Sequence, residues 1–411
     1  MIELTTEQQS AVTMVQNNRI SICVGGPGTG KTTVTKEIVK QAMCNHQSVS
    51  LCAPSGKAAR RLSEATGQEA STIHRLLGAQ MENGDFVFSH GESMPLKCDL
   101  LICDETSMVA NDLMADLLRA VNANKTSILF VGDQDQLPSI GPGSVLRDFL
   151  ASKAIPHTEL TVIHRNSGDI VRSCHQIKQG QTYTPSGTLT PETGQNLRHI
   201  EIKRPQDILG TIKALVCDRL PQRGYNPIWD IQVISPTNTR TAMSCGAINK
   251  VLQAELNPNP EIDGTIFRMG DKIINTKNKT YDDGYIVNGD IGQVLDINGK
   301  YLTIKFFDPD RIVEISKTDN HLLLAYSITC HRFQGSEAPV IIIPVHSAFT
   351  FFLNRPWIYT AISRARDICI TVGEFGAINH AIGRPANERN TKLKELLTVP
   401  SCNRQSPRRA E

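Results

Sequence analysis

Eight residues near the N-terminus, Gly25 to Thr32, have the types and spacing of a phosphate-binding loop. They read Gly-Gly-Pro-Gly-Thr-Gly-Lys-Thr and match the pattern G-x-x-x-x-G-K-[ST] at every fixed position. Backbone N–H groups of such a loop, and of the helix after it, can bind phosphate oxygens. Lys31 would reach the β- and γ-phosphates, and the Thr32 hydroxyl would bind Mg²⁺. The pattern predicts a nucleoside triphosphate site, and the flanking residues disfavour a chance glycine-rich turn.

A pair of acidic residues, Asp104 and Glu105, follows an apolar run at Asp99 to Cys103. Asp104 would hold Mg²⁺, directly or through water, and Glu105 would take a proton from an attacking water. The second carboxylate favours hydrolysis over transfer to a small molecule. The alternative is a solvated acidic turn.

One glutamine, Gln136, lies in the loop Gly132 to Pro138. At the end of a strand it could bond a γ-phosphate or the attacking water. The pattern alone also allows an ordinary loop residue.

These residues can act together only if they lie at the same edge of one sheet. Short apolar runs, each followed by a polar or glycine-bearing turn, predict strands over 20–24, 48–53, 99–103 and 127–131. Helix-like segments lie over 32–41, 57–65 and 111–122. Alternating strands and helices indicate an α/β fold with a parallel sheet, and ligands bind at the carboxyl ends of such strands.

The second half of the chain predicts a further α/β domain, with strands over 231–234, 340–344 and 368–372. Two stretches differ from their surroundings, a hairpin near 80–97 and a glycine-rich, β-rich region over 262–320. We expect a first domain over 1–77 and 98–150, a hairpin insertion over 78–97, a second domain over 151–261 and 321–400, an all-β insertion over 262–320, and a disordered tail over 401–411.

The overall composition limits the classes of protein to which the chain can belong. The 411 residues carry a net charge of only +2, so no global basic field indicates a nucleic-acid partner, although a local basic groove is compatible with this sum. The 11 cysteines are scattered without a C-x-x-C pair, which argues against a zinc site and a disulfide framework. No apolar run has the length of a membrane span, and the first residues lack signal-peptide features. A cytoplasmic location, bacterial or in a phage-infected host, is expected.

In this order the motifs resemble those of superfamily 1 helicases of the RecD-like, 5′-to-3′ branch, including the Dda-type phage enzymes. The resemblance covers nearly the whole chain. It rests on Leu4–Ala11, Gly25–Thr32, Ala53–Ala59, Thr72–Arg75, Asp104–Met108, Gly132–Pro138, Leu160-Thr161 with Arg165, Tyr326–Glu337 and Tyr359–Ala365. It implies two RecA-like domains, a small 1B hairpin that splits duplex, and an SH3-like 2B insertion.

The resemblance also implies roles in ATP hydrolysis. Lys31, Glu105, Gln136, Arg165 and Arg364 would be catalytic, the two arginines as fingers from the second domain; a surface salt bridge is the alternative for each arginine. Thr32 and Asp104 would hold Mg²⁺. The nucleotide would contact Gln8, Gly26, Pro27, Gly28, Thr29, Gly30, Lys31, Thr32, Thr33, Gly335 and Glu337.

DNA contacts implied by the resemblance lie on both α/β domains, where hydroxyls and cations suit phosphates without sequence readout. They are Ser55, Lys57, Thr72, His74, Arg75, Thr237, Thr329 and His331. A structural histidine is the alternative for His74 and for His331. Phe86 and Phe88 would stack on the junction base pair, unless the hairpin packs them on the body.

The function expected is an ATP- and Mg²⁺-dependent 5′-to-3′ DNA helicase, working in replication, recombination or repair. Its partners would be single-stranded DNA and single-strand/duplex junctions, with a single-strand-binding or replisome protein as a further partner. It would act as a monomer, without a membrane. Two alternatives stay open: a nucleic-acid-stimulated ATPase that moves without separating duplex, also on RNA, and a P-loop regulatory module with slow hydrolysis.

Overall fold

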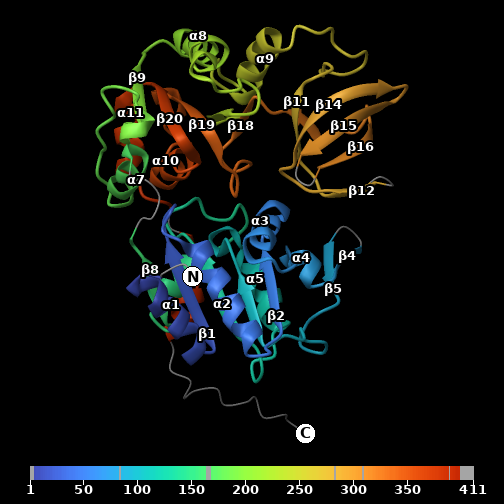
Figure 1. Ribbon diagram of the computed structural model, residues 1–411, viewed down its shortest axis with the longest axis vertical. Coiled ribbons are helices and arrows are strands. Elements are labelled where there is room, and N and C mark those ends of the chain that lie inside the picture. Colours follow the sequence, from blue (N-terminus) through green and yellow to red (C-terminus); the bar gives the residue numbers. More distant parts are fainter. Residues whose placement is uncertain are drawn as a thin grey trace.

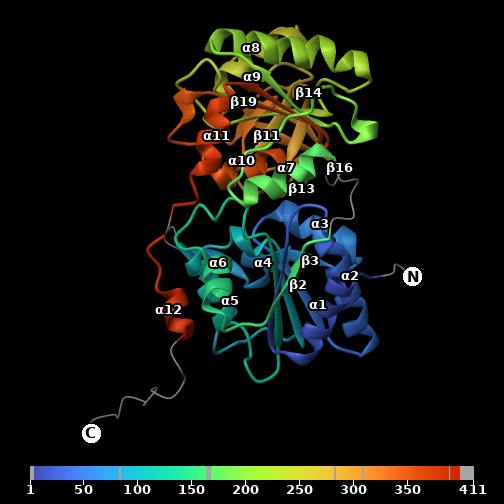
Figure 2. The same ribbon diagram turned by 90° about the vertical axis from the view of Figure 1, so that its left-hand side faces the viewer.

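The computed structural model describes residues 4–82, 85–162, 168–281, 284–307, 310–387 and 389–398. Two α/β domains, each with its own sheet, lie one above the other, and an all-β insertion stands beside the second (Figures 1 and 2). No helix in the described part of the chain is long and apolar enough to cross a membrane.

The first sheet has six parallel strands in the order β3-β2-β6-β7-β1-β8. Its strands are β1 (Ile20–Gly25), β2 (Val49–Ala53), β3 (Ala70–Thr72), β6 (Leu100–Cys103), β7 (Ser127–Gly132) and β8 (His157–Leu160). The helices of this domain are α1 (Thr6–Asn17), α2 (Lys31–Cys44), α3 (Gly56–Thr66), α4 (Ile73–Leu76), α5 (Asn111–Arg119) and α6 (Val145–Ser152). The predicted parallel α/β fold is confirmed.

The central strands are apolar because helices cover both faces of the sheet. Alternate residues enter different cores: Ile22 and Val24 pack in one hydrophobic cluster, whereas Cys23 packs in the other. The predicted boundary at residue 150 is wrong, because β8 pairs with β1 along Ile22↔His157 to Gly25↔Leu160. As an edge strand with only its last residue buried, β8 lacks the apolar run that marks the others.

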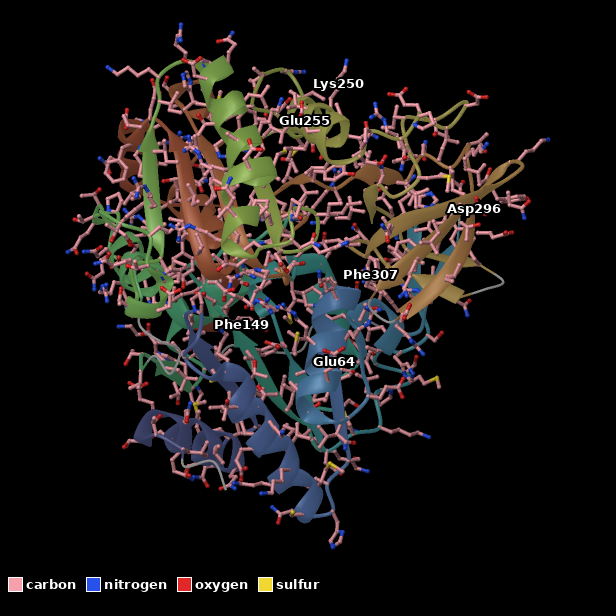
Figure 3. All side chains as sticks on the ribbon, turned by 45° about the horizontal axis from the view of Figure 1, so that its top comes forward. Glu64, Phe149, Lys250, Glu255, Asp296 and Phe307 are labelled. Carbon is pink, nitrogen blue, oxygen red and sulfur yellow. The ribbon has the colours of Figure 1, made fainter. Side chains whose placement is uncertain are left out.

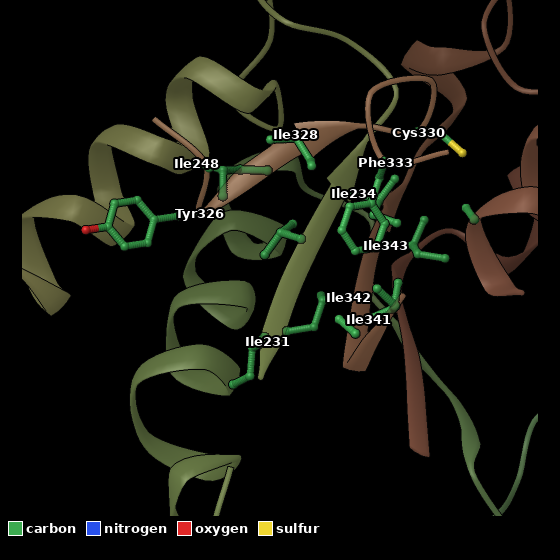
Figure 4. Close-up of a cluster of buried hydrophobic side chains, with 14 of the residues drawn as sticks. Ile231, Ile234, Ile248, Tyr326, Ile328, Cys330, Phe333, Ile341, Ile342 and Ile343 are labelled. Atoms are coloured by element: carbon green, nitrogen blue, oxygen red, sulfur yellow. The ribbon is translucent and has the colours of Figure 1, made fainter. Parts of the chain in front are cut away.

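The second sheet is also parallel and has the order β18-β10-β19-β20-β9. It contains β9 (Leu197–Glu201), β10 (Ile231–Ser235), β18 (Ser327–Thr329), β19 (Ala338–Val345) and β20 (Ala365–Gly373). The helices are α7 (Asp169–Lys178), α8 (Pro205–Ala214), α9 (Cys245–Leu256), α10 (Arg355–Ile362) and α11 (Phe375–Gly383). Isoleucines of β10 and β19 form its core with Ile248 of α9, and Phe333 reaches the same core from the loop after β18 (Figure 4).

The insertion forms a five-stranded antiparallel sheet in the order β16-β15-β14-β11-β17. The strands are β11 (Lys272–Asn275), β14 (Ile291–Asn298), β15 (Tyr301–Phe307), β16 (Asp310–Ser316) and β17 (Leu322–Leu324), with a separate pair β12 (Lys279–Tyr281) and β13 (Gly284–Ile286). The predicted end at residue 320 is too early, because Leu322 to Leu324 pair with β11. The SH3-like geometry stays a prediction.

The predicted hairpin consists of β4 (Ala79–Glu82) and β5 (Asp85–Phe88), which pair antiparallel. It projects beside α4 at the edge of the first domain (Figure 1). Residues 83 and 84, between the two strands, lie outside the described residues, as does the predicted tail over 401–411.

The C-terminal segment returns to the first domain, so its assignment to the second domain is wrong for residues 389–398. Helix α12 (Leu393–Thr398) packs on α6, and Leu393 and Leu397 join the core of the first domain. Arg389 donates to the backbone oxygens of Ser139, Gly141 and Gly143, at 2.6, 2.5 and 2.7 Å. Figure 2 shows this segment running down to α12 beside the first sheet. Partial burial of two leucines and the hydrogen bonds of Arg389 hold it there.

Candidate nucleotide site

The phosphate-binding loop connects the end of β1 to the start of α2. Gly28 and Gly30 have φ of 76° and 86°, a region that side chains other than glycine disfavour. A Cβ at Gly25 would lie 2.5 Å from the Thr29 hydroxyl, so the turn is closed too tightly for a larger residue. Strand, tight loop and helix thus have the predicted order, and the amides at the start of α2 open toward the cleft.

Lys31 lies at the mouth of this loop. Its ammonium donates to the carbonyl oxygens of Gly25 and Gly26, at 2.7 and 3.1 Å. These two neutral oxygens hold the cation on the open side of the loop without cancelling its charge. Phosphate oxygens entering the loop would meet this charge.

The acidic pair follows β6, in the same sheet as β1. Glu105 has φ of 49°, which is strained for a residue with a side chain, and its N–H donates to Asp104 Oδ1 at 2.8 Å. Burial and then the nearby Glu105 charge raise the pKa of the Asp104 carboxyl to about 7. Oε2 of Glu105 is buried and has no hydrogen-bond partner in the described part of the chain. Backbone strain, the buried Asp104 carboxyl and the buried Glu105 oxygen are thus concentrated at one point of the cleft.

The donor set here fits a hard divalent cation. Asp104 offers carboxylate oxygens, Thr32 offers an exposed hydroxyl on the same cleft, and the unfavourable burial of the Asp104 charge would be relieved by a bound cation. Oxygen ligands of this kind are those that Mg²⁺ accepts together with substrate phosphates.

One cleft of ≈ 520 Å³ brings together residues from both α/β domains. Its lining includes Gly26, Pro27, Gly28, Gly30, Lys31, Thr32, Thr33, Asp104, Glu105, Gln136, Gly335, Glu337 and Arg364, all predicted for the site. Thr29 and Gln8 do not line this cleft. Thr29 lines an adjacent, largely apolar cavity with Pro27, Leu160, Ile170 and Tyr359.

Gln8 lies behind the loop. Its amide donates to the Thr29 carbonyl at 3.4 Å, and its oxygen accepts from the Thr5 N–H at 3.1 Å, in the capping box of α1. Its predicted contact with the nucleotide stays a prediction.

The guanidinium of Arg364 reaches the cleft from the second domain and is 5% exposed. It donates to the carbonyl oxygens of Thr360 and Ser336 and to the Ser363 hydroxyl, at 3.2, 3.4 and 3.3 Å. None of these partners is a carboxylate, so the positive charge is held by neutral oxygens and is directed to the cleft. The other predicted finger, Arg165, lies outside the described residues.

Gln136 connects the cleft to the second domain. Its amide donates to Asp133 Oδ2 at 3.2 Å, while its own Oε1 is buried without a hydrogen-bond partner among the described residues. The same Asp133 oxygen accepts from the Tyr359 hydroxyl at 2.8 Å. The amide oxygen of Gln136 can accept from a water or a protonated group in the cleft.

A second set of bonds joins the next residue of this loop to the second domain. The Leu137 N–H donates to the Thr360 hydroxyl at 2.9 Å, and its carbonyl accepts from Gln334 at 3.1 Å. The loop after β7 is therefore bonded to two separate segments of the other domain.

Sequence reasoning missed three contributors to the site. Arg61 and Ser363 line the phosphate cleft, and Tyr359 lines the adjacent cavity. Arg61 stands four residues after Lys57, on the same side of α3, and this helical spacing was the available signal.

The predicted DNA contacts lie at the carboxyl ends of adjacent strands. Thr72 pairs with Ala53, just before Ser55, in the first sheet, and Thr329 pairs with Ser235, just before Thr237, in the second. The Ser55 and Thr72 hydroxyls cap α3 and α4, at 3.2 and 3.1 Å from the N–H groups of Ala58 and Arg75. Lys57 lies 6.0 Å from the ring centre of Phe333, and His331 is exposed in the same loop as Phe333.

The hairpin aromatics have different environments. Phe86 is 54% exposed, with its ring 4.8 Å from that of His74. Phe88, although 6.4 Å from Phe86, packs against the core of the first domain. Arg75 is exposed and lies 3.9 Å from Glu69. The alternative of packing on the body therefore holds for Phe88 and not for Phe86.

Comparison with known proteins gives two family matches: an AAA domain over residues 3–190 and a UvrD-like helicase C-terminal domain over 324–372. The ATP-dependent RecD2 DNA helicase of Deinococcus radiodurans is 35% identical over 96% of this chain. The chain spans 52% of that protein's length. The RecBCD enzyme subunit RecD of Mycolicibacterium smegmatis is 29% identical over 95% of this chain and 74% of that subunit.

Solved structures share the fold at lower identity. A Bacteroides Pif1 helicase in complex with ADP-AlF3 and ssDNA superposes with a TM-score of 0.56, at 20% identity, over 90% of this chain and 92% of that chain. Pif1 helicase from Candida albicans gives a TM-score of 0.53 at 18% identity, over 96% and 99%.

Proposed function

Because this chain is a RecD-like member of superfamily 1, we propose that it is an ATP-driven motor that moves 5′-to-3′ on single-stranded DNA and unwinds duplex. One observation carries the proposal: a single cleft collects Lys31, Asp104, Glu105, Gln136 and Arg364 from two domains. A regulatory module with slow hydrolysis would not need a buried cation from the second domain at this position. The chain matches about half the length of its RecD2 relative, so the activity of the whole is inferred from this site.

In the proposed mechanism, the loop amides and Lys31 hold the triphosphate. Mg²⁺, bound by Thr32 and Asp104, would supply charge neutralisation. Glu105 takes the proton from a water that Gln136 orients, and Arg364 stabilises charge that develops on the transferred phosphoryl group. Arg165 is proposed as a second finger by resemblance.

Hydrolysis is coupled to movement through the loop after β7. Gln136 senses the phosphate, and its partner Asp133 is bonded to Tyr359 of the second domain. Phosphate loss would change these contacts and let the domains move apart, which is the stroke of a two-domain motor.

The DNA track is proposed across the carboxyl ends of both sheets. Ser55, Thr72, Thr237 and Thr329 supply hydroxyls there, and Lys57 supplies a cation. Phe86 is proposed as the wedge that meets the duplex junction. The Bacteroides Pif1 helicase of similar fold is in complex with ssDNA, which supports this class of partner.

A competing function is favoured by the packing of Phe88 on the body, which leaves one exposed aromatic for strand separation. A translocase that moves without opening duplex needs no wedge. A single-strand-binding or replisome protein as partner, and action as a monomer, are parts of the main proposal.

The test compares two partial duplexes, one with a 5′ and one with a 3′ single-stranded tail, with ATPase followed in parallel. Opening of only the 5′-tailed duplex, lost in Lys31→Ala, is the expected result. ATPase stimulated by the strand with neither duplex opened would establish the translocase. The absence of any stimulation by DNA would overturn both.

A further inference from the structure

A cavity of ≈ 380 Å³ lies where three parts of the molecule meet, away from the nucleotide cleft. It is lined by Lys57 of α3, by Trp229 just before β10, and by Asp290, Ile291 and Phe307 of the insertion. Figure 3 labels Phe307 on the insertion and Glu64 on α3, the helix that also carries Lys57. The lining is mostly apolar, as is common for ligand sites at domain interfaces.

The apolar floor is aromatic. The Trp229 and Phe307 rings pack edge to face, 4.6 Å between centroids at 69°. Phe307 is 43% exposed, so part of its ring faces the cavity instead of a core. An aromatic ring left partly open in this way suits another flat ring.

The charge around the cavity favours an anion-bearing ligand. Asp290, the acidic member of the lining, is ion-paired with Arg311 and lies 4.0 Å from Arg60. Lys305 Nζ is 5.9 Å from the Phe307 ring centre and is ion-paired with Asp310 at 3.2 Å, and Lys57 lines the opposite side. Four cations, Lys57, Arg60, Lys305 and Arg311, thus face two carboxylates, and aromatic and basic groups alternate as in sequence-tolerant single-strand sites.

The location connects the cavity to the proposed DNA track. Lys57 lies two residues after Ser55, at the carboxyl edge of the first sheet, and approaches Phe333 in the loop that carries His331. A strand that follows this edge would pass the mouth of the cavity.

We propose that this cavity binds one unpaired nucleobase, which stacks on Phe307 with its edge against Trp229 while Lys57 and Lys305 face the flanking phosphates. The inference rests on the proposed function and adds the insertion to the DNA-binding surface. The apolar lining would accept any base, as a motor on arbitrary sequence requires.

The experiment uses tryptophan emission of the full chain titrated with oligo(dT), with anisotropy of a labelled oligo(dT) as an independent measure of binding. The chain has two tryptophans, and Trp357 is only 3% exposed, so a change in emission on binding reports Trp229. The expected result is quenching that saturates with the binding curve, and its loss in Trp229→Phe. Phe307→Ala should weaken binding by about 5- to 100-fold, whereas Phe307→Tyr should bind like the parent.

A control variant, Phe351→Ala, removes an aromatic that is 93% exposed elsewhere on the second domain, and should bind normally. Strands with abasic sites throughout should lose the quenching, which separates base stacking from phosphate contact. Binding seen by anisotropy with silent tryptophan, and unchanged in a folded Phe307→Ala protein, would overturn the inference alone. No binding of any strand by the parent protein would overturn the proposed function with it.

Discussion

The Tyr359 hydroxyl, on a helix of the second domain, donates a 2.8 Å hydrogen bond to the carboxylate of Asp133 at the end of the first domain's strand β7. The same oxygen of Asp133 accepts from Gln136. Burial and then the charge of Asp133 raise the pKa of Tyr359, so it remains a donor throughout the physiological range. One carboxylate oxygen therefore joins Gln136, the residue proposed to sense phosphate, to the other domain.

Tyr359→Phe should uncouple the two domains. It leaves a buried carboxylate oxygen with one donor fewer, at a cost of about 1–3 kcal/mol in the free energy of unfolding. We expect DNA-stimulated ATPase to fall more than basal ATPase, both measured by phosphate release. Tyr301→Phe, which changes an exposed tyrosine of the insertion, is the matched control. Equal loss of basal and stimulated rates would contradict the coupling role.

Glu105→Gln should keep ATP bound and stop its hydrolysis. The amide preserves shape and the strained backbone but cannot accept the proton of water, so kcat should fall by about 10²- to 10⁴-fold. Equilibrium binding of a fluorescent ATP analogue should be unchanged, in contrast to Lys31→Ala, which removes the charge near the phosphates. An ATPase rate near that of the parent would reject the role of Glu105 as general base.

The Asp104 carboxyl makes stability and Mg²⁺ binding depend on pH. Its pKa is raised from 3.8 to about 7, so between these values the folded protein holds a proton that the unfolded chain releases. The contribution of this group to stability therefore falls as the pH rises through that window. Tm should drop between about pH 4.5 and about pH 7 by more than in Asp104→Asn, and added MgCl2 should raise Tm mainly at the higher pH.

The exposed control Asp112→Asn should retain the full pH dependence of Tm. If Asp104→Asn gave the same profile as the parent, another group would be responsible.

Arg61 should bind phosphate from within the first domain. Arg61→Ala removes a cation from the cleft wall, and a lost charge-assisted hydrogen bond of about 1.5–3 kcal/mol corresponds to at least a tenfold rise in KM for ATP. The neighbouring Arg60 faces Asp290 of the insertion, so Arg60→Ala should leave KM for ATP unchanged. Steady-state ATPase at saturating DNA decides between the two. An equal change of KM for ATP in both variants would contradict a phosphate contact of Arg61.

Substitution of the two hairpin aromatics, Phe86 and Phe88, should have different effects: one on duplex unwinding and the other on the stability of the fold. Phe86→Ala should reduce unwinding of the tailed duplex while ATPase on single strands persists, because Phe86 is exposed and its removal breaks no core contact. Phe88→Ala should lower the free energy of unfolding by about 1–3 kcal/mol, because this ring packs on the first domain. Thermal unfolding and unwinding assays on both variants are required. Normal unwinding by Phe86→Ala would end the wedge assignment.

The sequence predicted those features that local pattern determines. The glycines of the loop Gly25 to Thr32 determine its conformation. The apolar runs of β1, β6 and β7 predict strands because both faces of these strands are buried. The domain assignments of β8 and α12 were wrong because their contacts are distant in sequence and involve few apolar residues. Strand β8 is a polar edge strand. Helix α12 is amphipathic, with two leucines in contact with the first domain.

The directions of individual side chains could not be predicted from the sequence pattern either. Phe86 and Phe88 are both aromatic and two residues apart, yet one is exposed and the other packs, because the contact of β5 with the body decides this. Arg60 and Arg61 look alike as a basic pair, but successive positions on α3 point to the insertion and to the phosphate cleft.

The return of the C-terminal segment to the first domain limits how the two domains can move relative to each other. The chain crosses from the first domain to the second between β8 and α7, and crosses back between α11 and α12. A body joined to another by one link can turn about any axis, whereas two separated links favour turning about the line between them. We therefore expect any relative movement of the two domains to be mainly a rotation about that line. The distance between a dye on each domain should follow this rotation.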